Sequence, residues 1–133
     1  MSDLRAVVVG TGMMGPGIAA TLAAGGIATC LVSRNSENAD KGLLQAKALL
    51  STLEKQGLLS SAQLAMALQC LSRSTDLDVQ VVNADFVVES IPEDLALKQR
   101  FFQRLASVAP RKSILASNTS GIPITKLQEN VSA

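Results

Sequence analysis

The chain has 133 residues, which suits one domain with a real hydrophobic core and leaves no comfortable room for a second domain. Hydrophobic residues make up 47% of the chain and charged residues 17%, as in an ordinary soluble globular protein. The 12 basic and 11 acidic residues leave the chain close to neutral, which argues against binding nucleic acid or a membrane surface through bulk charge.

The first half of the chain alternates predicted strands and helices. A short apolar run, Leu4–Val9, stops at a glycine and indicates a buried strand. A helix is predicted from Gly15 to the glycine pair that follows Ala24, and Ala28–Val32 is the second predicted strand. Apolar residues then recur three or four positions apart from Ser36 to Gln56, which predicts a long amphipathic helix.

The same alternation continues in the second half. Ser60 and Gln63 resemble a capping box, which predicts a short helix through about Ala67. Three more strands are expected: Gln69–Arg73, Phe86–Val88 and Ser113–Ala116. Between the last two we expect a helix over Asp94–Val108, with Leu95, Phe102 and Leu105 facing inward. Pro123 stands where a final helix can begin.

The order of these elements predicts the fold class. The strands are continuous apolar runs, which is typical of a parallel sheet covered by helices on both faces. We therefore expect an α/β fold, a doubly wound parallel sheet, for residues 1–133. No run approaches the roughly 20 apolar residues of a membrane span, and the first apolar run is too short for a signal peptide. Cys30 and Cys70 have no CxxC partner and are expected to be reduced core thiols, so we expect a cytoplasmic protein.

A glycine-rich turn follows the first predicted strand and opens the first helix. Its sequence matches the GxGxxG pattern of dinucleotide-binding domains at Gly10, Gly12 and Gly15. The first glycine permits the tight turn, the second lets a pyrophosphate approach the backbone, and the third lets helix and strand pack closely. The N–H groups of the helix N-terminus then face the phosphates. We expect Met13 and Met14, inside the turn, to pack against cofactor or a substrate domain.

The end of the second strand bears on the choice of cofactor. NAD-binding domains of this type place a carboxylate about twenty residues after the turn, where it accepts hydrogen bonds from the adenine ribose. This chain has Ser33 followed by Arg34 there. A hydroxyl and a guanidinium can bind a 2′-phosphate that a carboxylate would repel. The sequence thus favours NADP tolerance or preference, with a solvated loop arginine as the alternative.

Polar residues also follow two later strands. Glu89 ends the strand at 86–88, and Asn118 and Ser120 follow the strand at 113–116. Ligands of open α/β sheets bind at the carboxyl ends of strands, so these side chains could orient a nicotinamide, a ribose or a substrate hydroxyl. Each segment could equally be a turn or a helix cap.

Together these segments resemble the NAD-binding domain of the 3-hydroxyacyl-CoA dehydrogenase family over nearly the whole chain. The resemblance rests on residues 10–19, on the VVESI run at 87–91 and on the ASNTS run at 116–120. Residues 91–98 are also similar to the lambda-crystallin/L-gulonate dehydrogenase branch of that family. The resemblance implies a Rossmann-type, NAD-linked oxidoreductase of fatty acid metabolism that converts a 3-hydroxy group to a ketone. It also implies a homo-oligomer when the protein is full length.

The resemblance further implies roles for individual residues. Glu89 would lie beside the nicotinamide half of the cofactor, and Lys98 matches a lysine in the helix that follows. Asn118 would contact nicotinamide or substrate, and Ser120 matches the serine that hydrogen-bonds the reacting oxygen. The predicted catalytic residues are therefore Asn118 and Ser120, no metal site is expected, and the predicted cofactor contacts are Gly10, Gly12, Met13, Met14, Gly15, Ser33, Arg34, Glu89, Lys98 and Asn118.

The chain departs from the family pattern in three ways. Ser33 replaces the usual aspartate, which leaves NAD versus NADP open. The chain contains no histidine, whereas the family's catalytic histidine, paired with a glutamate, lies beyond the serine motif. The helical C-terminal substrate and dimerisation domain is absent, so we expect a sheet truncated before its last strands and a fragment that binds dinucleotide with little turnover.

Two alternative functions remain open at this point. One keeps the fold but changes the substrate from acyl-CoA to a small hydroxy acid or sugar acid. The other is a non-catalytic dinucleotide sensor, or a subunit that supplies the cofactor half to a partner, and the missing histidine supports it.

Overall fold

Five short parallel strands form one sheet in the order β3-β2-β1-β4-β5. The computed structural model describes residues 2–131. The strands are β1 (Arg5–Val9), β2 (Ala28–Val32), β3 (Leu71–Ser74), β4 (Phe86–Glu89) and β5 (Ile114–Ser117). The helices are α1 (Gly15–Ala24), α2 (Ser36–Lys55), α3 (Ser61–Cys70), α4 (Leu77–Val81), α5 (Leu95–Val108) and α6 (Ile124–Leu127).

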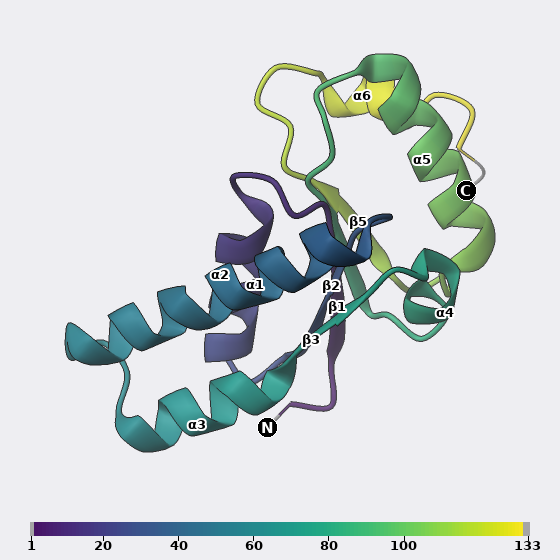
Figure 1. Cartoon of the computed structure of the whole chain (residues 1–133). Coiled ribbons are helices and arrows are strands. Elements are labelled where there is room, and N and C mark those ends of the chain that lie inside the picture. The colour runs from purple at the N-terminus through teal and green to yellow at the C-terminus, as the bar shows by residue number, and fades with distance from the viewer. Residues whose placement is uncertain (1, 132–133) are drawn as a thin grey trace.

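Helices cover both faces of the sheet, as the sequence predicts. Figure 1 shows α1, α2 and α3 on one side of the strands and α4, α5 and α6 on the other. Successive residues of β1 point to opposite faces: Val8 packs in the core beneath α1–α3, whereas Val7 and Val9 pack in the core beneath α4–α6. The central strand is therefore buried on both sides, which explains its unbroken run of apolar residues.

Chain order reverses on either side of β1, and this reversal determines where a ligand can bind. From β1 the chain crosses to β2 on one side, and it later returns to β4 on the other side. The last residue of β1, Val9, lies level with Val32 of β2 and Glu89 of β4. The loops that leave these strands diverge and create a crevice at their carboxyl ends, the usual ligand position in open α/β sheets.

Two expectations about local structure need correction, and one short helix was not predicted. The third strand begins at Leu71 instead of Gln69, because α3 continues through Cys70 and both Gln69 and Cys70 are helical. The five-residue helix α4 was not predicted, since it is too short to show a periodic apolar pattern. Leu95 was expected to face inward but is 40% exposed.

The exposure of Leu95 has a geometric cause. Lys98, one turn further along α5, forms an ion pair with Glu89, the last residue of β4. Leu95 stands at the very start of α5, before Lys98, the first buried residue of the helix.

None of the helices within residues 2–131 combines the length and the apolar character of a membrane span.

Candidate functional site

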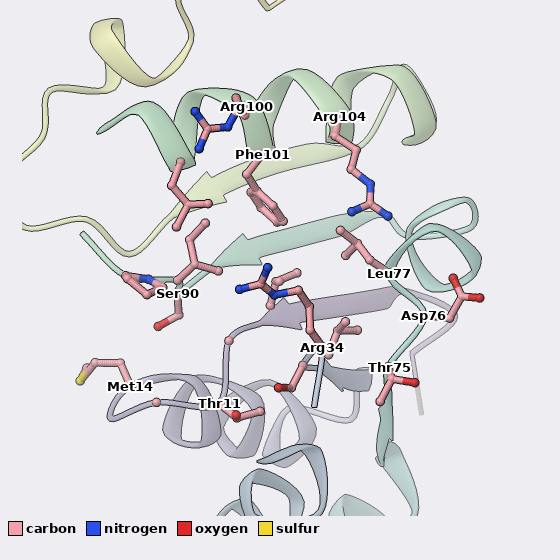
Figure 2. Close-up of a pocket in the computed structure, with 18 of the residues that line it drawn as sticks. Thr11, Met14, Arg34, Thr75, Asp76, Leu77, Ser90, Arg100, Phe101 and Arg104 are labelled. Atoms are coloured by element: carbon pink, nitrogen blue, oxygen red, sulfur yellow. The ribbon is translucent and has the colours of Figure 1, made fainter. Parts of the chain in front are cut away.

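A cleft of about 920 Å³ opens at the carboxyl ends of β1, β2 and β4 (Figure 2). Its walls come from the glycine-rich turn, the end of β2, the segment before α4, the loop after β4 and one side of α5. Six of the residues predicted to contact cofactor line it: Gly10, Gly12, Met13, Met14, Ser33 and Arg34. Other lining residues were not predicted from sequence, among them Asp76, Leu77, Ser90, Arg100, Phe101 and Arg104.

The three glycines of the turn have different surroundings. A methyl group on Gly10, whose φ is +110°, would meet the Ser90 carbonyl oxygen at 2.2 Å. One on Gly15 would meet the Gly10 carbonyl oxygen at 1.9 Å. At Gly12 a methyl group would meet nothing within 4 Å. Gly10 and Gly15 are thus required by the close packing of strand, turn and helix, whereas Gly12 leaves an open surface facing the cleft.

The N-terminus of α1 adjoins this open surface. Met14 occupies the N-cap position and provides no side-chain hydrogen bond to the first turn of the helix. Pro16 has no N–H, so the first-turn donors of α1 that remain for an anion are the N–H groups of Gly15 and Gly17, and the helix dipole favours negative charge there. Open space at Gly12 beside uncapped N–H groups fits the pyrophosphate of a dinucleotide.

Arg34 enters the cleft from the end of β2. Asn35, the next residue, caps α2 by accepting a hydrogen bond from the Asn38 N–H at 3.1 Å. The Ser33 hydroxyl accepts one from the Asn35 N–H at 3.3 Å. These two bonds fix the turn, and Figure 2 shows the guanidinium of Arg34 extending into the cleft. No carboxylate follows β2 in the turn to Asn35, so a hydroxyl and a cation line the cleft there.

The opposite wall of this end of the cleft comes from α4 and α5. Phe101 and Leu77 supply apolar surface, and Arg104 projects from α5 beside them (Figure 2). Asp78 holds Arg104, with its Oδ1 at 3.1 Å from Nε and 3.0 Å from Nη2. This wall was not predicted from sequence, because α4 was not predicted and because Phe101 lies outside the inward-facing stripe of α5. The one sequence feature that could have indicated the wall is Phe101 itself, a second aromatic residue next to the buried Phe102.

Glu89 and Lys98 do not reach the surface of the cleft. Glu89 is 0% exposed and Lys98 is 2% exposed, and neither lines the cavity. Lys98 Nζ lies 2.9 Å from Glu89 Oε2 and 2.8 Å from Glu93 Oε1. The three side chains form a triad of two carboxylates and one ammonium, of which Glu89 and Lys98 are buried. Glu93, which is 44% exposed, was not predicted and forms the outer end of this triad.

The triad is bonded to the segment that carries Asn118 and Ser120. The Ser117 hydroxyl donates to Glu89 Oε1 at 2.6 Å, and the Thr119 hydroxyl donates to Glu93 Oε1 at 2.8 Å. The Ser120 N–H donates to Glu93 Oε2 at 3.3 Å. Asn118 and Ser120 themselves are exposed and lie outside the lining of the cleft. Their contacts with nicotinamide and substrate remain predictions.

Comparison with known proteins agrees with this geometry. Residues 5–133 match the family described as 3-hydroxyacyl-CoA dehydrogenase, NAD binding domain. The chain is 36% identical over 127 residues to a probable 3-hydroxybutyryl-CoA dehydrogenase of Bacillus subtilis, covering 96% of this chain and 44% of that protein. It is 33% identical to the 5-formyl-3-hydroxy-2-methylpyridine 4-carboxylate 5-dehydrogenase of Mesorhizobium japonicum, covering 94% of this chain and 40% of the relative.

A solved structure is also similar. The 3-hydroxybutyryl-CoA dehydrogenase of Escherichia coli K12 superimposes with a TM-score of 0.91 at 30% identity, covering 99% of this chain and 28% of that chain. The present chain thus spans less than half of the length of each of these relatives.

Proposed function

Because the chain belongs to the family of 3-hydroxyacyl-CoA dehydrogenase NAD-binding domains, we propose that it holds the cofactor for oxidation of a 3-hydroxy group to a ketone. The observation that carries this proposal is the open surface at Gly12, between two glycines whose positions admit no side chain. When bound, a nicotinamide dinucleotide would accept a hydride from the substrate carbon. The chain itself would bind the dinucleotide, orient it toward the substrate and shield it from solvent.

Each part of the cleft suits one part of the dinucleotide. The pyrophosphate would lie against Gly12 and the N-terminus of α1, because N–H groups and open space coincide there. The adenosine half would lie between Arg34 and the apolar wall of Leu77 and Phe101. The nicotinamide half would then point toward Met14 and Ser90, at the end of the cleft nearer the loop after β4.

Substrate chemistry would take place next to the loop that follows β5. The Asn118 N–H donates to the carbonyl oxygen of Glu89 at 2.8 Å, so this loop lies beside the end of β4. We propose that the Ser120 hydroxyl hydrogen-bonds the reacting oxygen and that the Asn118 amide orients nicotinamide or substrate. The chain has no histidine, so a histidine that removes the hydroxyl proton would have to come from outside these 133 residues.

Fluorescence titration with NADH and NADPH tests the site. We expect saturable binding by the chain and at least about tenfold weaker binding by Gly12→Val, whose side chain would fill the pyrophosphate surface. Gly17→Ala is the matched control, since it adds a methyl group within α1, where the nearest atom, Leu49 Cδ1, is 4.0 Å away. Equal affinities of wild type and Gly12→Val would contradict the proposed site.

The finer choice between NAD and NADP depends on Arg34. We propose that Ser33 and Arg34 bind a 2′-phosphate and let the chain accept NADP. A hydrogen bond to a charged group contributes about 1.5–3 kcal/mol, equivalent to roughly 10- to 150-fold in affinity. Arg34→Asp should lower the NADPH/NADH affinity ratio by that factor. Lys47→Asp makes the same charge change on the exposed side of α2 and should leave the ratio unaltered.

The substrate class has a second candidate. The relative from Mesorhizobium japonicum acts on a pyridine carboxylate, according to its name, and is 33% identical to this chain. A small hydroxy acid is therefore an alternative to an acyl-CoA. Turnover of both substrate classes by a longer form of the protein, one that contains the proton acceptor, would distinguish them.

The chain by itself should bind cofactor but catalyse very slowly. Loss of general base catalysis removes about 10²–10⁴-fold in rate. Ordinary enzymatic rates of 3-hydroxyacyl-CoA oxidation by these 133 residues would refute this expectation. Binding without any catalytic role in the longer protein would instead favour the dinucleotide sensor or partner subunit.

A further inference from the structure

The loop after β5 is anchored through alternate residues. Ser117 and Thr119 are partly buried and donate their hydroxyls to Glu89 and Glu93, whereas Asn118 and Ser120 are exposed. Neighbouring side chains of an extended segment point in opposite directions. Holding the first and third side chains against the triad therefore directs the second and fourth, those of Asn118 and Ser120, away from it.

Further hydrogen bonds fix the loop in this arrangement. The Ser117 hydroxyl, besides donating to Glu89, accepts the Thr119 N–H at 3.1 Å. The Thr119 hydroxyl accepts the Ile122 N–H at 3.1 Å, and Glu93 accepts the Ser120 N–H at 3.3 Å. In the part of the chain that the structure describes, the side chains of Asn118 and Ser120 make no hydrogen bond of their own. Their polar groups are thus left for a ligand.

Lys98 joins the two carboxylates that hold the loop. Glu89 comes from the end of β4, Glu93 from the following loop and Lys98 from α5. Without the ammonium, two carboxylates would face each other at a site where Glu89 is fully buried, an arrangement that is strongly disfavoured. Glu89 Oε2 also accepts the Ile91 N–H at 2.8 Å, which ties the loop after β4 to the same centre.

We infer that Glu89, Lys98 and Glu93 are positioning residues, which orient Asn118 and Ser120 toward the nicotinamide and substrate by holding Ser117 and Thr119 from behind. This inference rests on the proposed function for its ligand. It adds a role in holding the loop to the cofactor contact expected of Glu89 and Lys98 from sequence. Their burial and their bonds to the loop and to Glu93 support that role.

Deleting the anchoring hydroxyls tests the inference without disturbing the buried charges. The test variants are Ser117→Ala and Thr119→Val, with Thr119→Ser as the conservative rescue. The matched controls are Ser107→Ala and Thr52→Val, because each removes a hydroxyl that bonds only a helix carbonyl, at 2.7 Å and 3.0 Å respectively. The readouts are NADH affinity, the NMR shift of the Asn118 side-chain amide on NADH addition, and hydrogen exchange of the backbone amides at 118–122.

We expect NADH affinity to fall at least about two- to tenfold in each test variant, because each removes two hydrogen bonds of the loop and one lost hydrogen bond usually has an effect of that size. The Asn118 amide should lose most of its shift, and amides 118–122 should exchange faster. Thr119→Ser should restore all three readouts, and the controls should behave as wild type. Unchanged readouts in both test variants while wild type still binds NADH would overturn the inference and leave the proposed function standing.

If wild type binds no dinucleotide, the proposed function fails, and hydrogen exchange in the free chain still decides the positioning role. Faster exchange at 118–122 in Ser117→Ala and Thr119→Val, but not in Ser107→Ala and Thr52→Val, would support anchoring by the triad. Equal exchange in all variants would overturn it.

Discussion

The ionisation of Glu93 and Lys98 is set by their mutual contact. Hydrogen bonds from Lys98 and then Thr119 lower the pKa of the Glu93 carboxyl from 4.5 to about 2. Burial lowers the pKa of Lys98, but its hydrogen bonds with Glu93 and Glu89 outweigh this effect and raise the pKa above its ordinary value of 10.5. Glu93 and Lys98 therefore keep their charges throughout the neutral range.

The pH dependence of stability should reflect these shifts. Because the folded-state pKa of Glu93 is depressed, its contribution is present above about pH 4.5 and is lost as pH falls toward about 2. The contribution of Lys98, whose pKa is raised, is complete below pH 10.5 and is lost at higher pH. The contributions of Glu93 and Lys98 should therefore not vary between about pH 5 and 10. Urea unfolding at several pH values checks this, and Glu93→Gln should remove part of the acid-side slope.

An outcome of no difference between wild type and Glu93→Gln below pH 4.5 would show that Glu93 titrates alike in the folded and unfolded chain. Glu37→Gln is a suitable control, because Glu37 forms an exposed ion pair with Lys41 at 3.2 Å on α2, far along the chain from the triad. Exposed pairs of this kind contribute little to stability.

At the scale of elements, α5 has two faces with separate tasks. Its inward face carries Lys98, Phe102 and Leu105 at positions i, i+4 and i+7, all buried against the sheet. Its cleft-facing side carries Arg100, Phe101 and Arg104. Asp94 begins the helix by accepting a hydrogen bond from the Leu97 N–H at 2.9 Å. One helix thus stabilises the core and forms a wall of the cleft.

Two neighbouring aromatic residues should separate these tasks. Phe102→Ala should lower the free energy of unfolding by about 3–5 kcal/mol, because it leaves a cavity in the core. Phe101→Ala removes a half-buried side chain from the cleft wall and should cost less stability but weaken NADH binding about tenfold. Urea unfolding and NADH titration of both variants provide the comparison. Equal effects of the two substitutions on both measurements would refute this division.

At the scale of the whole molecule, the cleft joins the two halves of the sheet. The turn after β1 and the end of β2 form one wall, and the loop after β4 together with α5 forms the other. These walls meet directly where the backbone of Gly10 approaches that of Ser90. A dinucleotide in the cleft would contact both halves and would bind only when they are assembled.

Ligand binding should therefore stabilise the whole chain. NADH at a hundred times its dissociation constant should raise the free energy of unfolding by about 2.7 kcal/mol. Thermal unfolding with and without NADH measures this shift, and Gly12→Val should show little of it at the same NADH concentration. A melting temperature that does not change at saturating NADH would contradict binding to the folded state.

Much of the fold was predictable because local patterns and global architecture agree. β2 has the predicted bounds, the capping box at Ser60 and Gln63 forms with bonds of 3.1 Å and 2.8 Å, and the parallel sheet is covered on both faces. The predictions failed where an element is too short for periodicity, as in α4, or where its surroundings change within one turn, as at Leu95. Periodicity indicates which side of a helix faces inward but not how far the neighbouring sheet extends.

The sequence by itself determined the strand–turn–helix with its three glycines, because the GxGxxG spacing between an apolar run and a helix is a local pattern in the chain. Composition alone also determined that these 133 residues contain no histidine, so an imidazole in the site would have to come from outside them. Only the tertiary structure decided that Glu89 and Lys98 are buried and that they form, with the partly exposed Glu93, a triad bonded to the loop that carries Asn118 and Ser120. That loop follows β4 by more than twenty residues, and the two segments meet only because β5 pairs with β4. Long-range pairing of strands brings these charges together, and no local pattern in the sequence encodes it.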